Sequence, residues 1–454
     1  MSKLSRSISR VVGGAVAAVL VAGGCIASAQ TAVADETPNT LLEGRAQLSA
    51  TYWAEGPESG KDSKPNNGMT PPYPGQVIPG FSGMVELSDG EFLALPDNGF
   101  GAKANSSDYL LRIYQVKPNW ETANTAANPE GVGGVEVQKY ISLRDPNNVI
   151  EWDIVNEGTA DRLLTGSDFD PESIVLDKDG SFWIGEEFGP YILHFSADGV
   201  LLDAPFAYPG IKSPSNPTLG DEKPTVRNSK GFEAMAGDGK YLYPIFEGYV
   251  DAATDKRVRI VSEFDTKKGA YTGRTWDYLV DAEDDLAADS FITKDGTMLV
   301  LERDDFWGPK AINRKVYAVD FKKAKPGSSL EKTVMADLLH INNPDRIGMV
   351  SDKGAYGVEE DFSFPFQSVE TIVELSDGRY LTAVDNNFPG NDARYPGKPD
   401  NTEMIIFSIQ GDDKGKPAEP AKPGKPGEPA TPAKPAEPAK PAKPGKPGLP
   451  KTGN

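Results

Sequence analysis

A repeated pattern of strand, Asp-Gly turn and strand is the feature that most constrains the fold of this chain of 454 residues. The segment M-V-E-L-S-D-G at residues 84–90 recurs as I-V-E-L-S-D-G at residues 372–378, and S-I-V-L-D-K-D-G occupies residues 173–180. Two weaker copies end in the Asp-Gly pairs at residues 238–239 and 295–296. An Asp-Gly pair between two apolar runs is a strong signal for a β-hairpin. Each copy therefore predicts a pair of antiparallel strands.

An outer strand follows several of these hairpins, as in the apolar runs at residues 110–116, 191–195 and 315–320. A repeated unit of hairpin and outer strand is the signature of a β-propeller. The five Asp-Gly pairs are 90, 59, 57 and 82 residues apart, whereas one blade takes about 40–50 residues. The wider gaps leave room for another blade, so we predict an all-β propeller of six or seven blades with long loop insertions over residues 35–410. A two-sheet sandwich with coincidental turns is the alternative.

The first 34 residues have the features of a secretory signal peptide. Lys3, Arg6 and Arg10 form a basic start, residues 11–22 form an apolar run, and A-V-A at residues 32–34 is a cleavage site. We therefore predict secretion of a mature chain that begins after this site, with an uncleaved membrane anchor as the alternative. Because the single cysteine of the chain lies within this segment, the mature protein is expected to contain none.

The C-terminal region has a composition that cannot form a folded core. A proline occurs at every third position from Pro417 to Pro450, which predicts a disordered polyproline II spacer over residues 411–448. The sequence L-P-K-T-G, which opens residues 449–454, resembles the signal by which the sortases of Gram-positive bacteria attach proteins to peptidoglycan. The hydrophobic stretch and basic tail of a complete signal do not follow it in this sequence, so either the true C-terminus is missing or the segment is a remnant of a sorting motif. We expect secretion, with attachment to the cell wall through sortase as a further hypothesis.

The chain is strongly acidic, with 67 Asp and Glu against 47 Lys and Arg and a formal charge of −20. The first 34 residues carry +3 and residues 411–454 carry +4, which leaves −27 on residues 35–410. Such a charge argues against binding to nucleic acid, because phosphate contacts need clustered Lys and Arg. One Cys and two His exclude a disulfide scaffold and a Cys-rich metal site, and leave little room for His ligands. Any chemistry of the folded domain must therefore depend on carboxylates.

The repeat places carboxylates at equivalent positions of successive units. Asp97, Glu187 and Asp385 lie seven residues after the turn glycines of their units, as does Arg303, while Glu247 lies eight residues after its own. Because equivalent positions in a propeller form a ring around the axis, we predict an acidic channel mouth that binds Ca²⁺, which accepts about six to eight oxygen ligands. Its predicted metal ligands are Asp97, Glu172, Glu233, Glu247, Glu302, Glu370 and Asp385. The alternative is that acids at strand ends are solvated or accept hydrogen bonds from turn amides.

Positively charged residues are few, but several lie near this ring in the sequence. Arg303 belongs to the acidic segment of residues 302–305, and Arg227, Lys230 and Arg314 lie in adjacent loops. An arginine in an acidic ring can hold carboxylates ionised, or it can bind a phosphate or carboxylate group through two hydrogen bonds. We therefore predict that Arg227, Lys230 and Arg314 bind substrate, with salt bridges that relieve repulsion as the alternative.

Three long segments resemble a known family. The segment F-D-P-E-S-I-V-L-D-K-D-G-S-F-W-I-G-E-E-F-G-P at residues 169–190 is similar to the hallmark of the secreted phytase-like family, often described as having esterase-like activity. Residues 83–101 and 368–389 are similar to its other typical stretches, and the resemblance covers most of residues 75–410. It implies a propeller-like domain outside the cell and metal-assisted hydrolysis of phosphate or other esters. The motif positions that match the family, without an assigned role, are Glu172, Glu186, Glu187 and Asp385.

These observations lead to one main functional hypothesis, a hydrolase of small-molecule esters or phosphoesters at the acidic channel mouth. Its candidate catalytic residues are Glu187 as general base, Arg303 as the group that stabilises developing charge, and Glu186. Two alternatives are a non-catalytic propeller that is tethered to the wall and binds a ligand, and a Ca²⁺-dependent lactonase-like hydrolase. We expect the protein to be a monomer.

Overall fold

The structure is a computed structural model that describes residues 39–124 and 133–410. The predicted signal peptide, proline-rich spacer and sorting motif lie outside the described residues, so these three assignments stay predictions. Within the two described ranges, the chain forms strands, three short 3-10 helices and loops, and no α-helix. Among the described residues, no helix is long and apolar enough to span a membrane.

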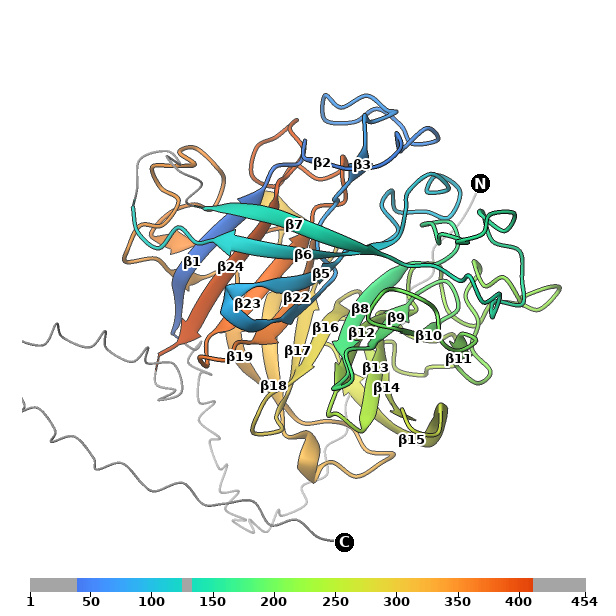
Figure 1. Cartoon of the computed structure of the whole chain (residues 1–454). Helices are drawn as coiled ribbons and strands as arrows, with labels where there is room; N and C mark the ends of the chain where they lie inside the picture. The colour runs from blue at the N-terminus through green and yellow to red at the C-terminus, as the bar shows by residue number, and fades with distance from the viewer. Residues whose placement is uncertain (1–38, 125–132, 411–454) are drawn as a thin grey trace, which may run out of the picture. The chain divides into compact units, whose positions relative to one another are not determined.

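Most strands of the described ranges belong to five antiparallel groups of four, of which three are separate sheets and two are joined edge to edge within one ten-stranded sheet (Figure 1). The first group consists of β4 (Gly83–Glu86), β5 (Phe92–Leu95), β6 (Arg112–Asn119) and β7 (Gly134–Ser142). The second consists of β8 (Pro171–Leu176), β9 (Phe182–Glu186), β10 (Tyr191–Phe195) and β11 (Phe206–Ala207). The third consists of β12 (Phe232–Gly237), β13 (Tyr241–Phe246), β14 (Val258–Asp265) and β15 (Ala270–Leu279).

The last two groups follow the same plan. The fourth consists of β16 (Leu286–Ile292), β17 (Met298–Arg303), β18 (Arg314–Val319) and β19 (Lys332–Asp337). The fifth consists of β22 (Ser368–Glu374), β23 (Tyr380–Asp385), β24 (Thr402–Ile409) and β1 (Thr40–Leu48). Two short pairs complete the strands, β2 (Trp53–Ala54) with β3 (Gln76–Val77) and β20 (Ile341–Asn342) with β21 (Asp361–Phe362), and β20 also pairs with β1 in parallel.

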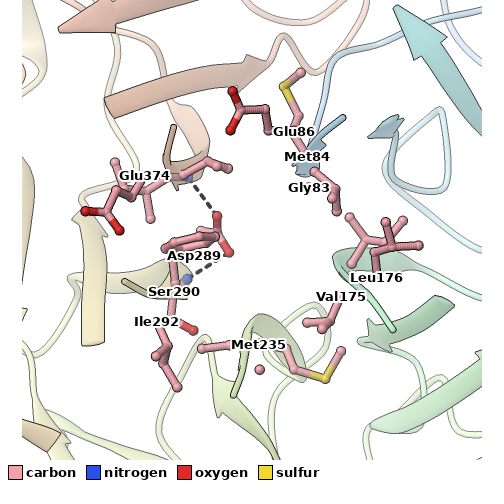
Figure 2. A pocket seen from close by; sticks show the side chains of 17 residues that line it. Gly83, Met84, Glu86, Val175, Leu176, Met235, Asp289, Ser290, Ile292 and Glu374 are labelled. Atoms are coloured by element: carbon pink, nitrogen blue, oxygen red, sulfur yellow. Dashed lines mark hydrogen bonds between the residues drawn. The ribbon is translucent and has the colours of Figure 1, made fainter. Parts of the chain in front are cut away.

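The first strands of the five groups surround a central axis. β4, β8, β12, β16 and β22 contact one another in that order, and β22 contacts β4 again, which closes the ring. Figure 2 looks into the space that they enclose, with residues from all five strands around it. The arrangement confirms the predicted β-propeller, but the described ranges contain five blades where six or seven were predicted. The widest gaps between Asp-Gly pairs accommodate long loops, such as residues 143–170, and no further blade.

Five clusters of buried apolar side chains hold the blades together, one at each contact between neighbouring blades. Leu93 of β5 and Ile184 of β9, for example, belong to the cluster between the first and second blades. Each fully buried side chain of this kind stabilises the fold by about 1.5–3 kcal/mol. Because blades pack face to face, second strands such as β5 and β17 are buried along their whole length. This explains why their sequences, F-L-A-L and M-L-V-L-E-R, are largely apolar with little alternation.

Each of the five predicted Asp-Gly turns joins the inner strand of a blade to its second strand. The turn glycine has a φ angle between 73° and 88° in all five turns. Glycine adopts this left-handed conformation without strain, whereas a side chain would disfavour it. In the second blade the amide of Gly180 donates to the carbonyl of Asp177 at 3.0 Å, which closes the turn. The repeat found in the sequence is therefore the inner hairpin of every blade.

The fifth blade closes the ring by joining the two ends of the described chain, so that β1 lies beside β24 (Figure 1). Glu403 of β24 has no exposed surface. One of its oxygens lies 2.6 Å from Nη2 of Arg45 on β1, and the other lies 2.5 Å from Nη2 of Arg394. Burial by itself would raise the pKa of Glu403, but the two guanidinium groups outweigh burial and lower this pKa to about 2. The closure of the propeller thus contains a buried carboxylate with its charge fully complemented.

Candidate functional site

Residues lie near the axis at two positions of the blades, of which the first is shared by all five blades. The first position lies at or just after the end of the second strand, and its residues are Asp97, Glu187, Glu247, Arg303 and Asp385. The second is a β-bulge near the start of the inner strand, which is found in four blades at Glu172, Glu233, Ala288 and Glu370. A bulge leaves one residue outside the strand ladder and re-aims its side chain. The fourth blade is distinctive, because it carries Arg303 and Ala288 where its neighbours carry acids.

All of these residues except Ala288 line a cavity of about 250 Å³, here called the axial pocket. The carboxylates that line it are Asp97, Asp170, Glu172, Glu187, Glu233, Glu247, Asp305, Glu370 and Asp385. All of them except Asp305 are buried. Lys230 and Arg303 are the two cations of the lining. Nine carboxylates therefore face two cations in a site with little access to water, which is unfavourable unless protons or further cations neutralise them.

Arg303 neutralises part of the axial pocket. Its Nη2 atom lies 2.8 Å from Oε1 of Glu247 and 3.0 Å from Oε1 of Glu370. The same atom lies 3.4 Å from Oε1 of Glu233, while Nη1 lies 2.9 Å from Oδ1 of Asp305. Burial opposes the charge of Arg303, but Glu247, Glu370 and Glu233 outweigh it and hold its pKa well above the usual value. The guanidinium group thus acts as a fixed cation for the acids of the third and fifth blades.

The second blade gathers three carboxylates without such a partner. Asp170, Glu172 and Glu187 each place an oxygen within 4.8 Å of the other two. Among the described ion pairs, none involves these three residues, and the nearby Lys230 pairs with Glu247. Oxygen atoms in this number and spacing are suited to a hard divalent cation such as Ca²⁺. We call this group the blade-2 triad.

Two other groups of three carboxylates meet the same spacing, and both include Glu233. One adds Glu172 and Glu370, and the other adds Glu187 and Glu247. Arg303 already contacts Glu233, Glu247 and Glu370. A metal ion at either group would therefore compete with a bound guanidinium, which makes the blade-2 triad the better cation site.

Several carboxyl groups of the axial pocket have pKa values above their ordinary range. Burial, with repulsion from Glu233, raises the pKa of Glu172 well above its ordinary value. Burial, with repulsion from Glu247, does the same for the pKa of Glu187. Burial also raises the pKa of Asp97 to about 7, to which the charge of Glu370 contributes. The pocket would thus gain either protons near neutral pH or a metal ion in their place.

The same inner strands enclose a second cavity of about 320 Å³ nearer their C-terminal ends, shown in Figure 2. Its lining is rich in methionine, valine, leucine and isoleucine side chains. Asp289 is one of its few acids and accepts hydrogen bonds from the amides of Ser290 and Ile372, both at 2.7 Å. Glu374 accepts a hydrogen bond from the amide of Lys294 at 2.8 Å. Acids at this end of the channel are therefore satisfied by the main chain.

Glu186 and Glu302 lie outside the axial pocket, contrary to their predicted roles. Glu186, predicted to be catalytic, has no exposed surface, and amides of the following turn donate to its Oε1 atom at 2.7 and 2.9 Å. Glu302, predicted to bind metal, is equally buried and pairs with Lys332. Because successive residues of a strand point in opposite directions, a strand end that directs Glu187 or Arg303 toward the axis turns its neighbour away. We therefore assign a structural role within the blades to both acids, in place of catalysis for Glu186 and metal binding for Glu302.

Of the three residues predicted to bind substrate, only Lys230 lines the axial pocket. Arg227 is exposed at an adjoining cavity, with its guanidinium 4.6 Å from the centre of the Tyr249 ring. Arg314 has no exposed surface, donates to a main-chain carbonyl at 2.6 Å and pairs with Asp304 at 3.0 Å. A guanidinium group buried among these partners cannot reach a substrate, so the prediction for Arg314 is wrong.

Asp170 and Asp305 line the axial pocket, but the sequence repeat does not single them out. Asp170 lies two residues before Glu172 in the segment D-P-E, and Asp305 lies two residues after Arg303. The one sequence signal that could have identified Asp170 and Asp305 as pocket residues is that each lies close to a repeat position. The repeat locates a strand end, but the loop or bulge beside it decides which neighbouring acid also reaches the axis.

Several solved structures resemble this chain at low sequence identity. A luciferin-regenerating enzyme is 10% identical with a TM-score of 0.35, and the match covers 84% of this chain and 94% of that chain. The WD40 propeller domain of Doa1 is 9% identical with a TM-score of 0.31, and the match covers 83% of this chain and 99% of that one. An exo-β-1,3-galactanase from Phanerochaete chrysosporium is 8% identical with a TM-score of 0.38, and the match covers 81% and 64%.

Sequence comparison gives a more specific result. An uncharacterized secreted protein from Arthroderma benhamiae is 35% identical over 112 residues, which cover 20% of this chain and 22% of that protein. This chain thus matches about a fifth of the length of that relative. A family model described as phytase-like, with esterase-like activity of phytase, matches residues 76–388. This range is more than half of the chain and includes every residue named above for the axial pocket, so the protein belongs to the phytase-like family.

Proposed function

We propose that this protein is a secreted hydrolase that cleaves phosphate esters or related esters in the axial pocket, with Ca²⁺ bound to the blade-2 triad. The observation that carries the proposal is the charge deficit of the pocket, where nine carboxylates face only Lys230 and Arg303. Membership of the phytase-like family supports the ester-cleaving part. The signal-peptide features of the sequence and the secreted relative support the location outside the cell. Attachment to the cell wall through residues 449–454 is a further part of the hypothesis.

The residues of the blade-2 triad fit a calcium ion. Asp170, Glu172 and Glu187 offer only oxygen ligands, and their oxygens already lie within 4.8 Å of one another. When bound, Ca²⁺ would supply positive charge that neutralises the substrate anion and polarises the bond to be cleaved. The triad would release its protons in exchange for the ion, because ligands must be ionised to bind.

Proton transfer is best assigned to Asp97. Glu187, the general base suggested by the sequence, belongs to the blade-2 triad, and its Oε1 atom accepts a hydrogen bond from the amide of Gly231 at 2.9 Å. Asp97 lines the same pocket, and its pKa of about 7 lies where a general acid or base works best near neutral pH. In the proposed reaction, the Asp97 carboxylate accepts a proton from the attacking water. The water oxygen bonds to the phosphorus or carbonyl carbon of the ester, the bond from that atom to the alcohol oxygen breaks, and the proton passes from Asp97 to the oxygen of the departing alcohol.

The two cations of the pocket have complementary roles in the proposal. Arg303 is held by Glu247 and Glu370, so its guanidinium stays fixed while the charge of the substrate develops. Lys230 reaches the pocket from the loop that precedes β12 and is partly exposed. Together they would attract an anionic ester into a pocket that is otherwise negative, and Arg303 would stabilise the transition state.

The test is a panel of phosphomonoesters, phosphodiesters, carboxylic esters and lactones, assayed with Ca²⁺ and with a chelator. We expect one ester class to be hydrolysed, and we expect chelator or Asp97→Asn to reduce turnover by at least about a hundredfold while the folded state persists. Asp289→Asn is the matched control, because Asp289 is a buried axial acid outside the pocket. Turnover that is insensitive to chelator would contradict the role of the metal. Calcium-dependent stability without turnover of any member of the panel would favour a propeller that only binds a ligand. Turnover of lactones alone would favour a lactonase.

A further inference from the structure

The loop between β17 and β18, residues 304–313, connects the axial pocket to two larger cavities. Asp305 lines the axial pocket and both neighbours, whose volumes are about 560 and 910 Å³, and Phe306 lines the two neighbours. We infer that the largest of these cavities, here called the rim groove, binds an uncharged aromatic group of the ester substrate. This inference rests on the proposed function, because it concerns the part of the substrate that lies beside the reacting ester.

Exposed apolar side chains are concentrated around these cavities. Phe306, Trp307 and Tyr356 line the rim groove and are 50%, 37% and 42% exposed. Ile312 lines the neighbouring cavity and is 74% exposed. These four residues are among nine large hydrophobic side chains that are exposed in the described part of the chain. Apolar side chains gathered at a cavity beside a polar site are typical of a ligand pocket rather than of ordinary surface.

The loop that carries these side chains is held firmly from its buried side. Asp304 accepts a hydrogen bond from the amide of Phe306 at 2.7 Å and pairs with Arg314 at 3.0 Å. Arg314 in turn donates to the carbonyl of Phe306. The indole nitrogen of Trp307 donates to Oδ1 of Asp392 at 2.8 Å. The backbone of this loop and the Trp307 ring are therefore held in place before a ligand binds, which lowers the entropy lost on binding.

The charges of the rim groove argue against an anionic occupant. Its acidic lining residues are Asp305, Glu359 and Asp392. Of its two cations, Arg394 already binds Glu403 at 2.5 Å, which leaves Lys310. A ring that carries several phosphate groups would place negative charges beside these acids, whereas an uncharged aromatic ring can stack on, or pack edge-to-face against, the aromatic side chains of the groove.

The test compares wild type and Trp307→Ala on the 2-naphthyl and methyl esters of whichever acid the substrate panel identifies. We expect the substitution to raise the KM of the naphthyl ester about tenfold, which corresponds to about 1.4 kcal/mol. The KM of the methyl ester should change less than about twofold, because a methyl group does not reach the groove. Trp307→Phe should restore most of the loss. Tyr52→Ala is the control, because Tyr52 is 36% exposed and lines none of these cavities.

Binding of 2-naphthol, followed by fluorescence in the presence of chelator, tests the groove without turnover. We expect wild type to bind 2-naphthol and Trp307→Ala to bind it at least about tenfold more weakly. Naphthol binding through Trp307 without hydrolysis of any ester would leave the groove in place and refute the proposed function. If esters are hydrolysed but Trp307→Ala changes neither the KM of the naphthyl ester nor the binding of naphthol, the inference that the rim groove binds an aromatic group is wrong. Preferential binding of methyl glucoside or inositol hexakisphosphate over naphthol would also overturn it.

Discussion

Two buried carboxylates in this propeller lie in opposite electrostatic surroundings. Glu403, at the closure of the ring, contacts Arg45 and Arg394, and its pKa is lowered to about 2. Glu172, in the axial pocket, has acids as its principal charged neighbours, and together with burial they hold its pKa well above the ordinary value. Both side chains are buried, with 0% and 6% of their surface exposed. Burial alone therefore does not explain why the pKa of Glu403 is lowered and that of Glu172 is raised.

The difference lies in whether the fold supplies the opposite charge. At the closure, the guanidinium groups of Arg45 and Arg394 complement the carboxylates of Glu403 and Asp352, so the site is complete without a ligand and serves to hold β1 against β24. In the axial pocket, Arg303 and Lys230 complement only some of the acids, and the blade-2 triad has no cation among the described ion pairs. A charge deficit of this kind lowers stability and is typical of functional sites, where a bound ligand provides the missing positive charge.

The largest effect is expected from Glu403→Gln. The substitution leaves the buried guanidinium groups of Arg45 and Arg394 without their shared carboxylate, which should reduce the free energy of unfolding by roughly 3–5 kcal/mol. Urea unfolding of the variant and wild type measures this loss. Because the closure needs no ligand, the loss should be the same with Ca²⁺ and with chelator. A loss that Ca²⁺ restores would show that the two regions are not independent.

The pH dependence of stability should be governed by the axial pocket in the presence of chelator. The pKa of Asp97 is about 7 in the folded state, above its ordinary value of 3.8, and burial with like charges raises the pKa values of Glu172 and Glu187 as well. The folded state therefore binds more protons than the unfolded state, so stability should fall by a few kcal/mol as the pH rises from about 4.5 to about 8. Thermal melts across this range measure the effect. Stability that rises steadily to pH 8 in chelator would contradict the assigned charge deficit.

Calcium should reverse this loss at pH 8. An ion that binds only the folded state stabilises it by about 2.7 kcal/mol when its concentration is a hundred times the Kd. Glu172→Gln removes one ligand of the blade-2 triad and one repulsive charge, so the variant should be at least as stable as wild type in chelator and gain little from Ca²⁺. Urea unfolding of both proteins with and without Ca²⁺ separates the two effects. An equal gain in both would place the ion elsewhere.

The smallest effect is expected at the apolar end of the channel. Asp289→Asn keeps the size of the side chain but retains a single acceptor oxygen for the amides of Ser290 and Ile372. The free energy of unfolding should fall by about 1–2 kcal/mol, as for other buried hydrogen bonds that lose an acceptor. The response to Ca²⁺ should be unchanged, because Asp289 lies outside the axial pocket. A lost response to Ca²⁺ would show that the two ends of the channel are coupled.

The sequence predicts the inner hairpins and the register of the axial acids, because both depend on local chemistry. The turn glycine needs a left-handed φ angle, and a fixed number of residues separates it from the end of the next strand, as with Gly180 and Glu187. The number of blades is not predictable in the same way. Loops such as residues 143–170 occupy the gaps between repeats. Because loop lengths vary irregularly, the spacing of the repeats does not give the number of blades.

The separation of functional from structural acids also exceeds what spacing can show. Glu186 and Glu187 are neighbours in the sequence, yet one accepts hydrogen bonds from turn amides and the other faces the axis. The bulge at Glu172 decides the direction of its side chain, which spacing along the sequence does not show. Arg314 was predicted to bind substrate, but its guanidinium donates to the carbonyl of Phe306 and so helps to hold the loop of residues 304–313 in place. Such assignments depend on partners distant in the sequence.

The most direct test of the account is a calorimetric titration of Ca²⁺ into the full chain at pH 8, with Glu172→Gln and Asp289→Asn alongside. The blade-2 triad predicts one ion bound per wild-type chain, at least about tenfold weaker binding to Glu172→Gln, and unchanged binding to Asp289→Asn. Absence of Ca²⁺ binding to wild type, or equal binding to Glu172→Gln, would contradict the claim that the charge deficit of the axial pocket is a cation site.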